Sequence, residues 1–360
     1  MKISIPFFMP IFLVVGVRGI AQTDSIYRDT GVQKNYFIAI PVAFYSDETN
    51  LGFGTSAGYY FGARNGKVSN IQGNAVYTLK NQYGFSILPK IYTNNQTQYY
   101  SGYVKANYYP DKYYGIGRNT NDSVREDYTS KDFSLLVQWQ RMVFGKFMVG
   151  FQSQVNYYKV LDIEQNGLLA NEITDVNKKV TIGMGLLFTR DTRSSTFYPS
   201  TGNFTKISYM AYSKIMGSEL NFTRLTADFR NFFTLGRVPV LAFQLYGDFT
   251  WGEPPFQLMP MLGGGDILRG FYRGRYRDDM MLCAQVEYRF PIHKRLKGTA
   301  FVSAGDVSKD FKDFSLTGPK YSYGVGLRVK VNPVNVHIRL DVAFTGQNDP
   351  AVYFTANEAF

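Results

Sequence analysis

The chain of 360 residues contains one cysteine and two histidines, and its formal net charge is +11. One cysteine excludes an intrachain disulfide, and so few ligand side chains predict neither a metal site nor another cofactor. The basic residues are spread singly, which argues against nucleic-acid binding. Aromatic residues make up 17% of the chain while its mean hydropathy is −0.20. That combination excludes a helical membrane protein and is typical of a transmembrane β-barrel.

Residues 1–21 have the pattern of a secretory signal peptide. Lys2 supplies a positive start, residues 11–17 (IFLVVGV) end an apolar stretch, and small residues before Gln22 suit cleavage there. The alternative is an uncleaved anchor, although prolines and an arginine interrupt a stretch already short for crossing a membrane. We expect residues 22–35 to form a short periplasmic segment, because so few residues cannot make a folded domain.

Residues 36–360 alternate apolar and polar side chains in short segments, as strands do when one face meets water and the other an apolar medium. Within residues 280–291, for example, one face carries Glu287 and Arg289 while the other carries Tyr288. The pattern predicts one all-β domain, a transmembrane antiparallel β-barrel of about 16 strands. The first strands are expected at residues 36–44 and 51–61, and the others begin near Ser69, Tyr83, Thr97, Lys131, Phe147, Lys178, Asn203, Glu219, Val238, Met280, Gly298, Tyr321, Val334 and Ala351.

The lengths of the connections indicate which end of the barrel faces outward. With a periplasmic N-terminus, the long connections fall outside and short turns face the periplasm, as in bacterial barrels. The long connections are expected at residues 110–130, 162–177, 251–279 and 306–318, and short turns at Gly145, residues 236–237 and residues 332–333. A soluble β-sandwich would also alternate, but its inner faces would have to fill one core. Here one face of each strand carries ions and amides.

Three motifs stand out along this pattern. Residues 262–271 (LGGGDILRGF) lie in the longest external connection, residues 190–202 (RDTRSSTFYPSTG) follow the eighth strand, and residues 352–360 (VYFTANEAF) end in phenylalanine. Together they resemble the outer-membrane assembly and secretion barrels of the BamA/TamA type, the bacterial surface antigen family. The resemblance extends over residues 36–360.

This resemblance implies roles for particular residues. Arg269, Gly270 and Phe271 match the signature of a loop that folds into the lumen, where the arginine pairs with acidic groups of the wall. The implied periplasmic turn motif is Asp191, Tyr198, Pro199 and Gly202, and the implied assembly signal is Phe354 and Phe360. Independently, Glu287 faces the lumen on the next strand, and a buried guanidinium needs a carboxylate partner. The alternative is a solvated basic loop, since three more arginines follow.

The chain departs from the family pattern in two ways. Ser303 stands on the thirteenth strand where the family often has an inward-facing aspartate, and Asp306 is the nearest acidic residue to replace it. The assembly and secretion members of the family also carry periplasmic substrate-docking domains. Residues 22–35 are too few to form one.

Residues 54–58 (GTSAG) fit the nucleophile pattern G-x-S-x-G. That motif needs a sharp strand-to-helix turn with histidine and acid partners, whereas these residues lie inside an alternating strand. The histidines are His293, in an expected periplasmic turn, and His337, on a lumen face. The least implausible enzyme would be a lipid-modifying one that combines His337 with a wall serine. We expect the protein not to be an enzyme.

The resemblance implies a protein of the Gram-negative outer membrane that assists insertion or translocation of protein, or of lipid. The implied mechanism is a weak seam between the first and last strands, whose unpaired edge can template another chain. Gly324 and Gly326 near that end would soften the wall, although glycine also serves barrel curvature. The expected partners are outer-membrane lipid, including lipopolysaccharide, and an unidentified periplasmic or exported protein. The alternatives are a passive channel for small solutes and a surface-binding role of the external loops.

Overall fold

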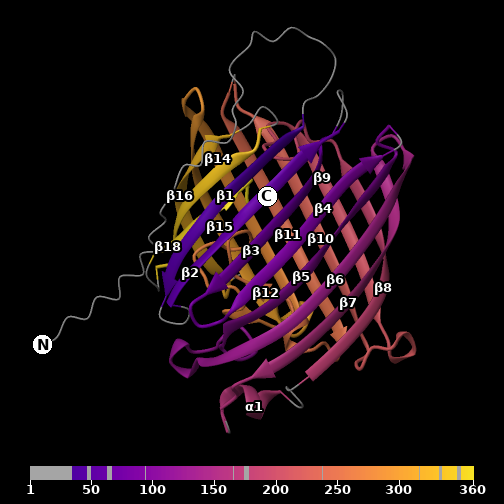
Figure 1. The fold of residues 1–360 in the computed structure, drawn as a ribbon, viewed down its shortest axis with the longest axis vertical. Helices are drawn as coiled ribbons and strands as arrows, with labels where there is room; N and C mark the ends of the chain where they lie inside the picture. The colour runs from indigo at the N-terminus through magenta and orange to yellow at the C-terminus, as the bar shows by residue number, and fades with distance from the viewer. Residues whose placement is uncertain are drawn as a thin grey trace, which may run out of the picture.

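The computed structural model describes residues 35–360 except 47–49, 63–66, 94, 165, 174–177, 237, 316, 332–334 and 347–349. The described residues form one curved sheet of 16 antiparallel strands that wraps into a barrel (Figure 1). The predicted all-β class and the predicted number of strands are confirmed. The expected signal peptide and almost all of the expected periplasmic segment lie outside the described residues.

The strands follow one another around the wall in chain order. They are β1 Tyr36–Ser46, β2 Asn50–Phe61, β3 Ser69–Thr78, β4 Tyr83–Thr93, β5 Gln98–Tyr113, β6 Glu126–Phe144, β7 Phe147–Leu161, β8 Lys178–Asp191, β9 Gly202–Tyr212, β10 Phe222–Thr234, β11 Val240–Gly252, β14 Met280–His293, β15 Leu296–Ser308, β16 Lys320–Lys330, β17 His337–Phe344 and β18 Ala351–Ala356. The connections hold the small hairpin of β12 Met261–Leu262 and β13 Tyr276–Arg277, helix α1 Leu168–Glu172, and the 3-10 turns η1 Asp122–Val124, η2 Lys214–Met216, η3 Phe256–Leu258 and η4 Phe311–Asp313.

One predicted external loop, residues 110–130, is shorter than expected. The β5–β6 ladder continues to the pair Tyr113 and Glu126, so only residues 114–125 connect the two strands. Polar side chains in residues 110–130 suggested a loop, but in the structure they form hydrogen bonds with one another. For example, the Tyr128 hydroxyl donates to Asp111 Oδ2 at 3.1 Å. A hydrogen-bonded polar ladder needs no apolar face, and alternation alone therefore underestimates its length.

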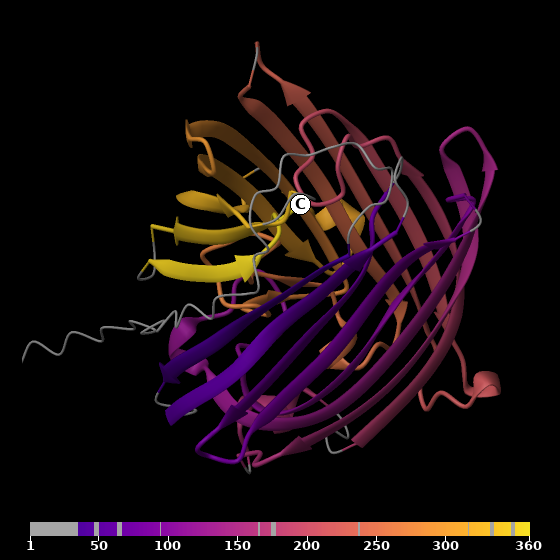
Figure 2. The ribbon, with the colours of Figure 1, turned by 45° about the horizontal axis from the view of Figure 1, so that its top comes forward.

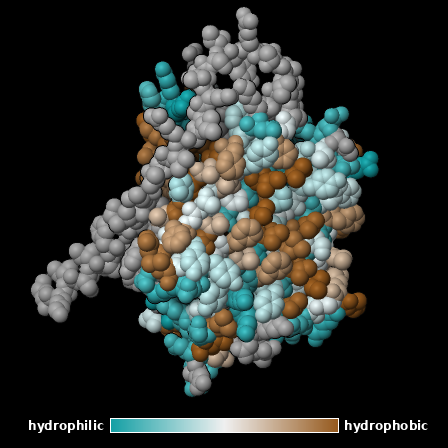
Figure 3. Space-filling view, viewed as in Figure 1, coloured by the Kyte–Doolittle hydropathy of each residue, from teal (hydrophilic) through white to brown (hydrophobic). Residues whose placement is uncertain are grey.

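The wall separates two environments as the alternation predicts. On β14 the side chains of Gln285, Glu287 and Arg289 are buried toward the lumen, whereas Tyr288 is exposed on the outer surface. The outer surface in Figure 3 carries its apolar side chains mainly over the middle of the wall, with hydrophilic ones toward both ends. That distribution fits an apolar band bounded by two aqueous sides. No helix among the described residues is long and apolar enough to cross a membrane.

The sheet has two free edges, β1 and β18, and no ladder joins them among the described residues. Figure 2 shows the indigo β1 and the yellow β18 on the same side of the molecule. Strand β18 has 6 residues and β1 has 11, so β1 offers the longer edge. Pro41 lies in the middle of β1, which suits an edge strand because proline donates no ladder hydrogen bond.

Candidate functional site

The connection between β11 and β14, residues 253–279, folds back into the lumen. Its backbone turns at Gly263 and Gly270, both with positive φ, and a Cβ on Gly263 would lie 2.1 Å from the Tyr272 carbonyl oxygen. Only glycine fits there. Leu268 also has a positive φ of 53°, which a non-glycine residue adopts only where its surroundings hold it. The loop packs on the wall in one apolar cluster of Leu262, Leu268, Phe271, Tyr276, Met281, Cys283 and Val307.

Arg269 in this loop is fully buried and contacts two carboxylates of the wall. Its Nη2 lies 2.8 Å from Glu287 Oε2, and its Nη1 lies 2.7 Å from Asp341 Oδ2. Its guanidinium carbon is also 3.5 Å from the centre of the Phe301 ring. A buried guanidinium is stable only with partners of this kind. The structure thus brings Arg269 and Glu287 together and adds Asp341 on β17, which the sequence did not single out.

Ser303 and Asp306, the two positions considered for the missing aspartate, have other partners. The Ser303 hydroxyl donates to Gln285 Oε1 at 3.0 Å, and Asp306 Oδ2 lies 3.3 Å from Arg118 Nη2 in an external connection. The second carboxylate beside the loop comes from Asp341, two strands further along the wall. The sequence feature that could have identified Asp341 is its position on the polar face of an alternating strand.

A larger buried network of charges surrounds that contact. Arg289 Nε donates to Glu287 Oε1 at 2.8 Å. Arg328 Nη1 lies 2.5 Å from Asp341 Oδ1, and its Nε lies 2.6 Å from Glu358 Oε2. These side chains are all almost completely buried. Carboxylates and guanidinium groups from β14, β16, β17 and the residues after β18 therefore meet at one place in the lumen.

We call this group the Arg269 network; it consists of Arg269, Glu287, Arg289, Arg328, Arg339, Asp341 and Glu358. Its four arginines face three buried carboxylates, and Arg339 Nη2 also reaches the exposed Asp266, whose Oδ1 is 3.2 Å away. An ion left without a partner at such depth costs several kcal/mol. The Arg269 network therefore ties the loop, three wall strands and the chain end into one unit.

The predicted turn motif begins where β8 ends, in the connection between β8 and β9. Arg193 Nε donates to Asp191 Oδ1 at 2.9 Å, and Lys67 Nζ lies 2.7 Å from Asp191 Oδ2. Burial lowers the pKa of Lys67, and the nearby Asp191 carboxylate opposes that shift. Gly202 has a φ of 92°, and a Cβ there would lie 2.2 Å from the Thr192 carbonyl oxygen. The turn is thus fixed by charge at its start and by a required glycine at its end.

Tyr198 and Pro199 of the turn reach the Arg269 network. The Tyr198 ring lies 4.4 Å from the ring of His337, and Lys297 Nζ lies 3.5 Å from its centre. Burial raises the pKa of Tyr198, so its hydroxyl stays neutral. The Pro199 carbonyl oxygen accepts a hydrogen bond of 3.4 Å from Arg289 Nη1. The turn motif and the lumenal loop are therefore linked through Arg289 and Glu287, which pair with each other on β14.

The two residues of the predicted assembly signal lie in different environments. Phe354 is half-buried within β18. After β18 the backbone turns at Asn357, whose φ is +71°, and the chain enters the lumen. Phe360 is only 3% exposed and packs with Phe232 and Ala242. The structure does not bring Phe354 and Phe360 together.

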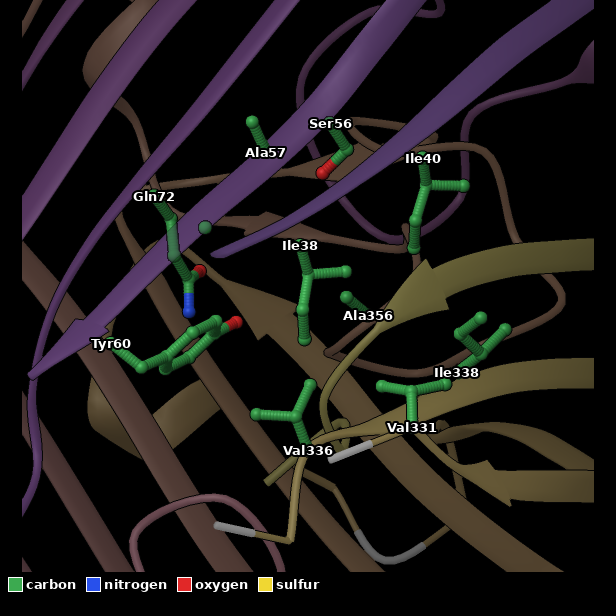
Figure 4. Close-up of a pocket in the computed structure, with 11 residues that line it drawn as sticks. Ile38, Ile40, Ser56, Ala57, Tyr60, Gln72, Val331, Val336, Ile338 and Ala356 are labelled. Carbon is green, nitrogen blue, oxygen red and sulfur yellow. The ribbon is translucent and has the colours of Figure 1, made fainter. Parts of the chain in front are cut away.

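The two free edges of the sheet meet through side chains. In Figure 4, Ile38 and Ile40 of β1 point toward Val336, Ile338 and Ala356, and all five line one small pocket. The lining is mostly apolar, with Ser56, Tyr60 and Gln72 as its polar members. The contact contains no ladder hydrogen bonds between β1 and β18 in the described part of the chain. We call this contact the seam. Every other neighbouring pair of strands in the described wall is joined by a ladder, so the seam lacks the backbone hydrogen bonds that hold the rest of the sheet.

The seam joins the inner face of β1 to the outer face of β17. On β17, His337 and Arg339 are buried toward the lumen, so Ile338 between them points outward. On β1, Phe37 is 69% exposed on the outer surface, so Ile38 beside it points inward. These two isoleucines line the same pocket. The edges of the sheet therefore overlap.

The G-x-S-x-G motif, residues 54–58, lies near the seam and does not have the geometry of a hydrolase site. Ser56 is inside β2, where it pairs with Ile40 of β1, and no strand-to-helix turn follows it. His337 packs on Tyr198, and His293 is exposed at the end of β14. Nothing in these positions builds the nucleophile, base and acid arrangement that the motif requires.

A polar cavity of about 730 Å³ lies between the lumenal loop and the opposite wall. Its lining includes Tyr103, Lys105 and Asp132 from β5 and β6, and Arg273 from the loop. The loop therefore occupies part of the lumen and leaves a polar chamber beside it.

These features define the class of the protein. The sequence model of the Omp85 superfamily domain matches residues 28–360, so the chain belongs to the Omp85 superfamily. The family resemblance drawn from the three motifs is confirmed. Membership and fold together indicate a barrel of the Gram-negative outer membrane, in a family of insertion and secretion proteins.

Two solved structures share this fold. BamA from Haemophilus ducreyi lacking POTRA domains 1–3 is 14% identical with a TM-score of 0.57, over 89% of this chain and 69% of that one. CdiB from Acinetobacter baumannii is 12% identical with a TM-score of 0.56, over 90% of this chain and 59% of that one. The chain thus spans only part of the length of these proteins. No curated protein sequence matches it.

Proposed function

We propose that this barrel assists the insertion or translocation of protein at the outer membrane by offering the free edge of β1 to a strand of its substrate. The observation that carries the proposal is the seam, where the 11 residues of β1 have no ladder partner other than β2 among the residues that the structure describes. An unpaired edge presents backbone donors and acceptors that a second chain can satisfy by β-augmentation. The partners under this proposal are an exported or periplasmic protein and the surrounding lipid, including lipopolysaccharide.

The Arg269 network has a structural role in this proposal. It holds the loop in the lumen and fixes β14, β16 and β17 relative to one another. Movement is then confined to the seam, where the edges meet through a mostly apolar group of side chains. Arg269, Gly270, Phe271 and Glu287 would act as a lock rather than as reacting groups.

A reversible disulfide across the seam tests the proposal. In a Cys283→Ala background, we would replace Ile38 and Ala356 by cysteine, because both side chains line the same pocket. Oxidation should seal the seam and lower the outer-membrane levels of other proteins in cells, and a reductant should restore them. A control pair at Asn74 and Ser86, which already face each other in the β3–β4 ladder away from the seam, should have no effect.

The rival function is a passive channel for small solutes. If the sealed seam leaves protein levels unchanged while the purified protein conducts small ions in planar bilayers, the channel replaces our proposal. Loss of adhesion on deleting external loops, with neither of these effects, would instead indicate a surface-binding role.

A further inference from the structure

We propose that the outer face of β6, β7 and β8 holds a binding site for an anionic phospholipid, one whose headgroup carries phosphate without a compensating ammonium group. The site lies at the end of these strands where Gly145 and Lys146 form the turn between β6 and β7, the end expected to face the periplasm. The proposal concerns the lipid around the barrel and not the substrate at the seam, so it does not depend on the seam opening.

The first observation is a cluster of aromatic rings around Phe147. The centre of the Phe147 ring lies 4.7 Å from that of Phe144 and 5.7 Å from that of Phe188. Phe144 is exposed on the outer surface. Girdles of aromatic side chains mark the interfaces between the apolar band of a barrel and the water beside it. The cluster therefore places this end of the strands close to the lipid headgroups.

The second observation is a group of three cations beside these rings. Arg190 pairs with Phe147 in the β7–β8 ladder, and its guanidinium carbon lies 5.4 Å from the centre of the Phe147 ring. Lys146 precedes Phe147 in the turn, and Arg141 lies near the end of β6. Since β6 and β8 are two strand spacings of about 4.8 Å apart, one headgroup is within reach of both long arginine side chains.

Both arginines point away from the lumen. Gln140, before Arg141, is buried toward the lumen, and so is Thr189, before Arg190. Side chains alternate along a strand, so the two arginines face the surroundings of the barrel.

These cations have no acidic counterpart on the outer face. Neither residues 139–151 nor residues 184–190 contain an aspartate or a glutamate. Asp191, the next residue, is buried and already contacts Arg193 and Lys67. The nearest carboxylate along these strands is therefore on the lumen face and paired.

The side chains of the three cations remain available to an anion. In the part of the chain that the structure describes, Arg141 and Lys146 have no carboxylate partner, and Arg190 donates to the amide oxygen of Asn203. A phosphate would supply the missing countercharge, and guanidinium groups bind phosphate well. An ammonium group would find only like charges here.

The spacing of charges along β6 places the site at headgroup level. Lys131 and Arg141 lie on the outer face at opposite ends of this strand. Their separation is about 33 Å along the strand, or about 25 Å across the membrane at a tilt of about 40°. That is the height of the apolar band of a barrel. The outward residues between them are Phe133, Leu135, Val137 and Trp139. Arg141 therefore lies where acyl chains end and phosphates begin.

The occupant is an anionic phospholipid of the leaflet at this end of the barrel. Its phosphate would contact Arg141, Lys146 and Arg190, and its acyl chains would cover the rings around Phe147. A zwitterionic headgroup gains less, because its ammonium group would lie among three cations. Each cation beside an anionic headgroup should favour the anionic lipid by about fivefold.

Quenching of tryptophan fluorescence tests the proposal on the full-length protein in lipid vesicles. Trp251→Phe leaves Trp139 as the only tryptophan, on the same face of β6 as Arg141. The probes are phosphatidylglycerol and phosphatidylethanolamine with brominated acyl chains, each in a background of phosphatidylcholine. We expect phosphatidylglycerol to associate beside Trp139 at least about fivefold more strongly than phosphatidylethanolamine. High salt should reduce this preference, because it screens exposed charges.

Two variants remove the cations. Arg141→Gln combined with Arg190→Gln should reduce the preference several-fold in protein that still migrates as a folded barrel on unheated gels. Lys146→Gln changes only an exposed turn residue and should reduce the preference by a smaller factor. The matched control is Lys131→Gln combined with Lys159→Gln, since these two lysines pair on the outer face at the other end of the same strands. The control should leave the preference unchanged.

Three results would overturn the proposal. The first is equal quenching by the two brominated lipids, and the second is a preference that survives both cation variants. The third is displacement of brominated phosphatidylglycerol from Trp139 by added lipopolysaccharide, which would show that the phosphate comes from that lipid instead. None of these results depends on the sealed-seam experiment, so the proposed function stands or fails separately.

Discussion

Asp341→Ala tests whether the Arg269 network holds the lumenal loop in place. The change removes the carboxylate that lies 2.7 Å from Arg269 and 2.5 Å from Arg328. Four buried arginines would then face two buried carboxylates. Removing one partner of a buried ion pair costs about 3–5 kcal/mol, because the remaining charge stays buried without compensation. We expect the free energy of unfolding to fall by that amount.

The measurement is unfolding in detergent micelles with increasing denaturant, followed by the loss of the fast-migrating folded form on unheated gels. Asp127→Ala is the control, since the Asp127–Arg125 pair at 3.2 Å is largely exposed and such pairs contribute at most about 1 kcal/mol. Proteolysis of the loop and bilayer conductance should both increase in Asp341→Ala, because the loop is released.

A double-mutant cycle isolates the contact itself. Arg269→Ala combined with Asp341→Ala should cost less than the sum of the two single changes, with a coupling of about 0.5–3 kcal/mol. The reasoning is refuted if Asp341→Ala is no more destabilising than Asp127→Ala, or if the two changes in the network are additive.

Three further predictions concern the other motifs. Phe360→Ala should slow assembly and destabilise the barrel by about 3–5 kcal/mol, because it empties a buried site; Phe354→Ala, at a half-buried position, should cost less, and refolding yield with denaturant unfolding compares the two. Gly202→Ala should lower the folded yield, since its Cβ would overlap a carbonyl oxygen, while Gly236→Ala has a similar positive φ but no atom within 4 Å; equal yields would contradict the steric argument. Mass spectrometry of protein from outer membranes should give a mature chain that starts at Gln22, and an intact N-terminus would show an uncleaved anchor instead.

Local pattern accounts for most of what could be predicted about the wall. A strand has a side-chain period of two, so the sequence around Glu287 and Tyr288 is enough to assign one face to the lumen and the other to lipid. Applied from His337, which was expected on a lumen face, the same rule puts Arg339 and Asp341 on that face as well. The rule failed at the end of β5. There Asp111 and Tyr128 form a hydrogen bond across the β5–β6 ladder, which continues into residues expected to form a loop.

The candidate site was only partly within reach of the sequence. The glycines around Arg269 indicated a tightly turned loop, and Glu287 was the nearest lumen-facing carboxylate along the chain. The contact with Asp341 joins residues 72 apart in sequence. Which inward carboxylate meets the loop depends on how far each strand is displaced along its neighbours, and alternation contains no information about that displacement.

The sequence by itself determined the number of strands, the two faces of the wall and the family, because each of these follows from local periodicity or from short motifs. Only the tertiary structure decided that Phe360 enters the lumen, that Arg269 shares its charge between β14 and β17, and that the sheet ends overlap at Ile38 and Ile338. These are contacts between segments far apart in the chain. They form only after the sheet has curved, when the geometry of the whole barrel fixes which side chains lie within reach.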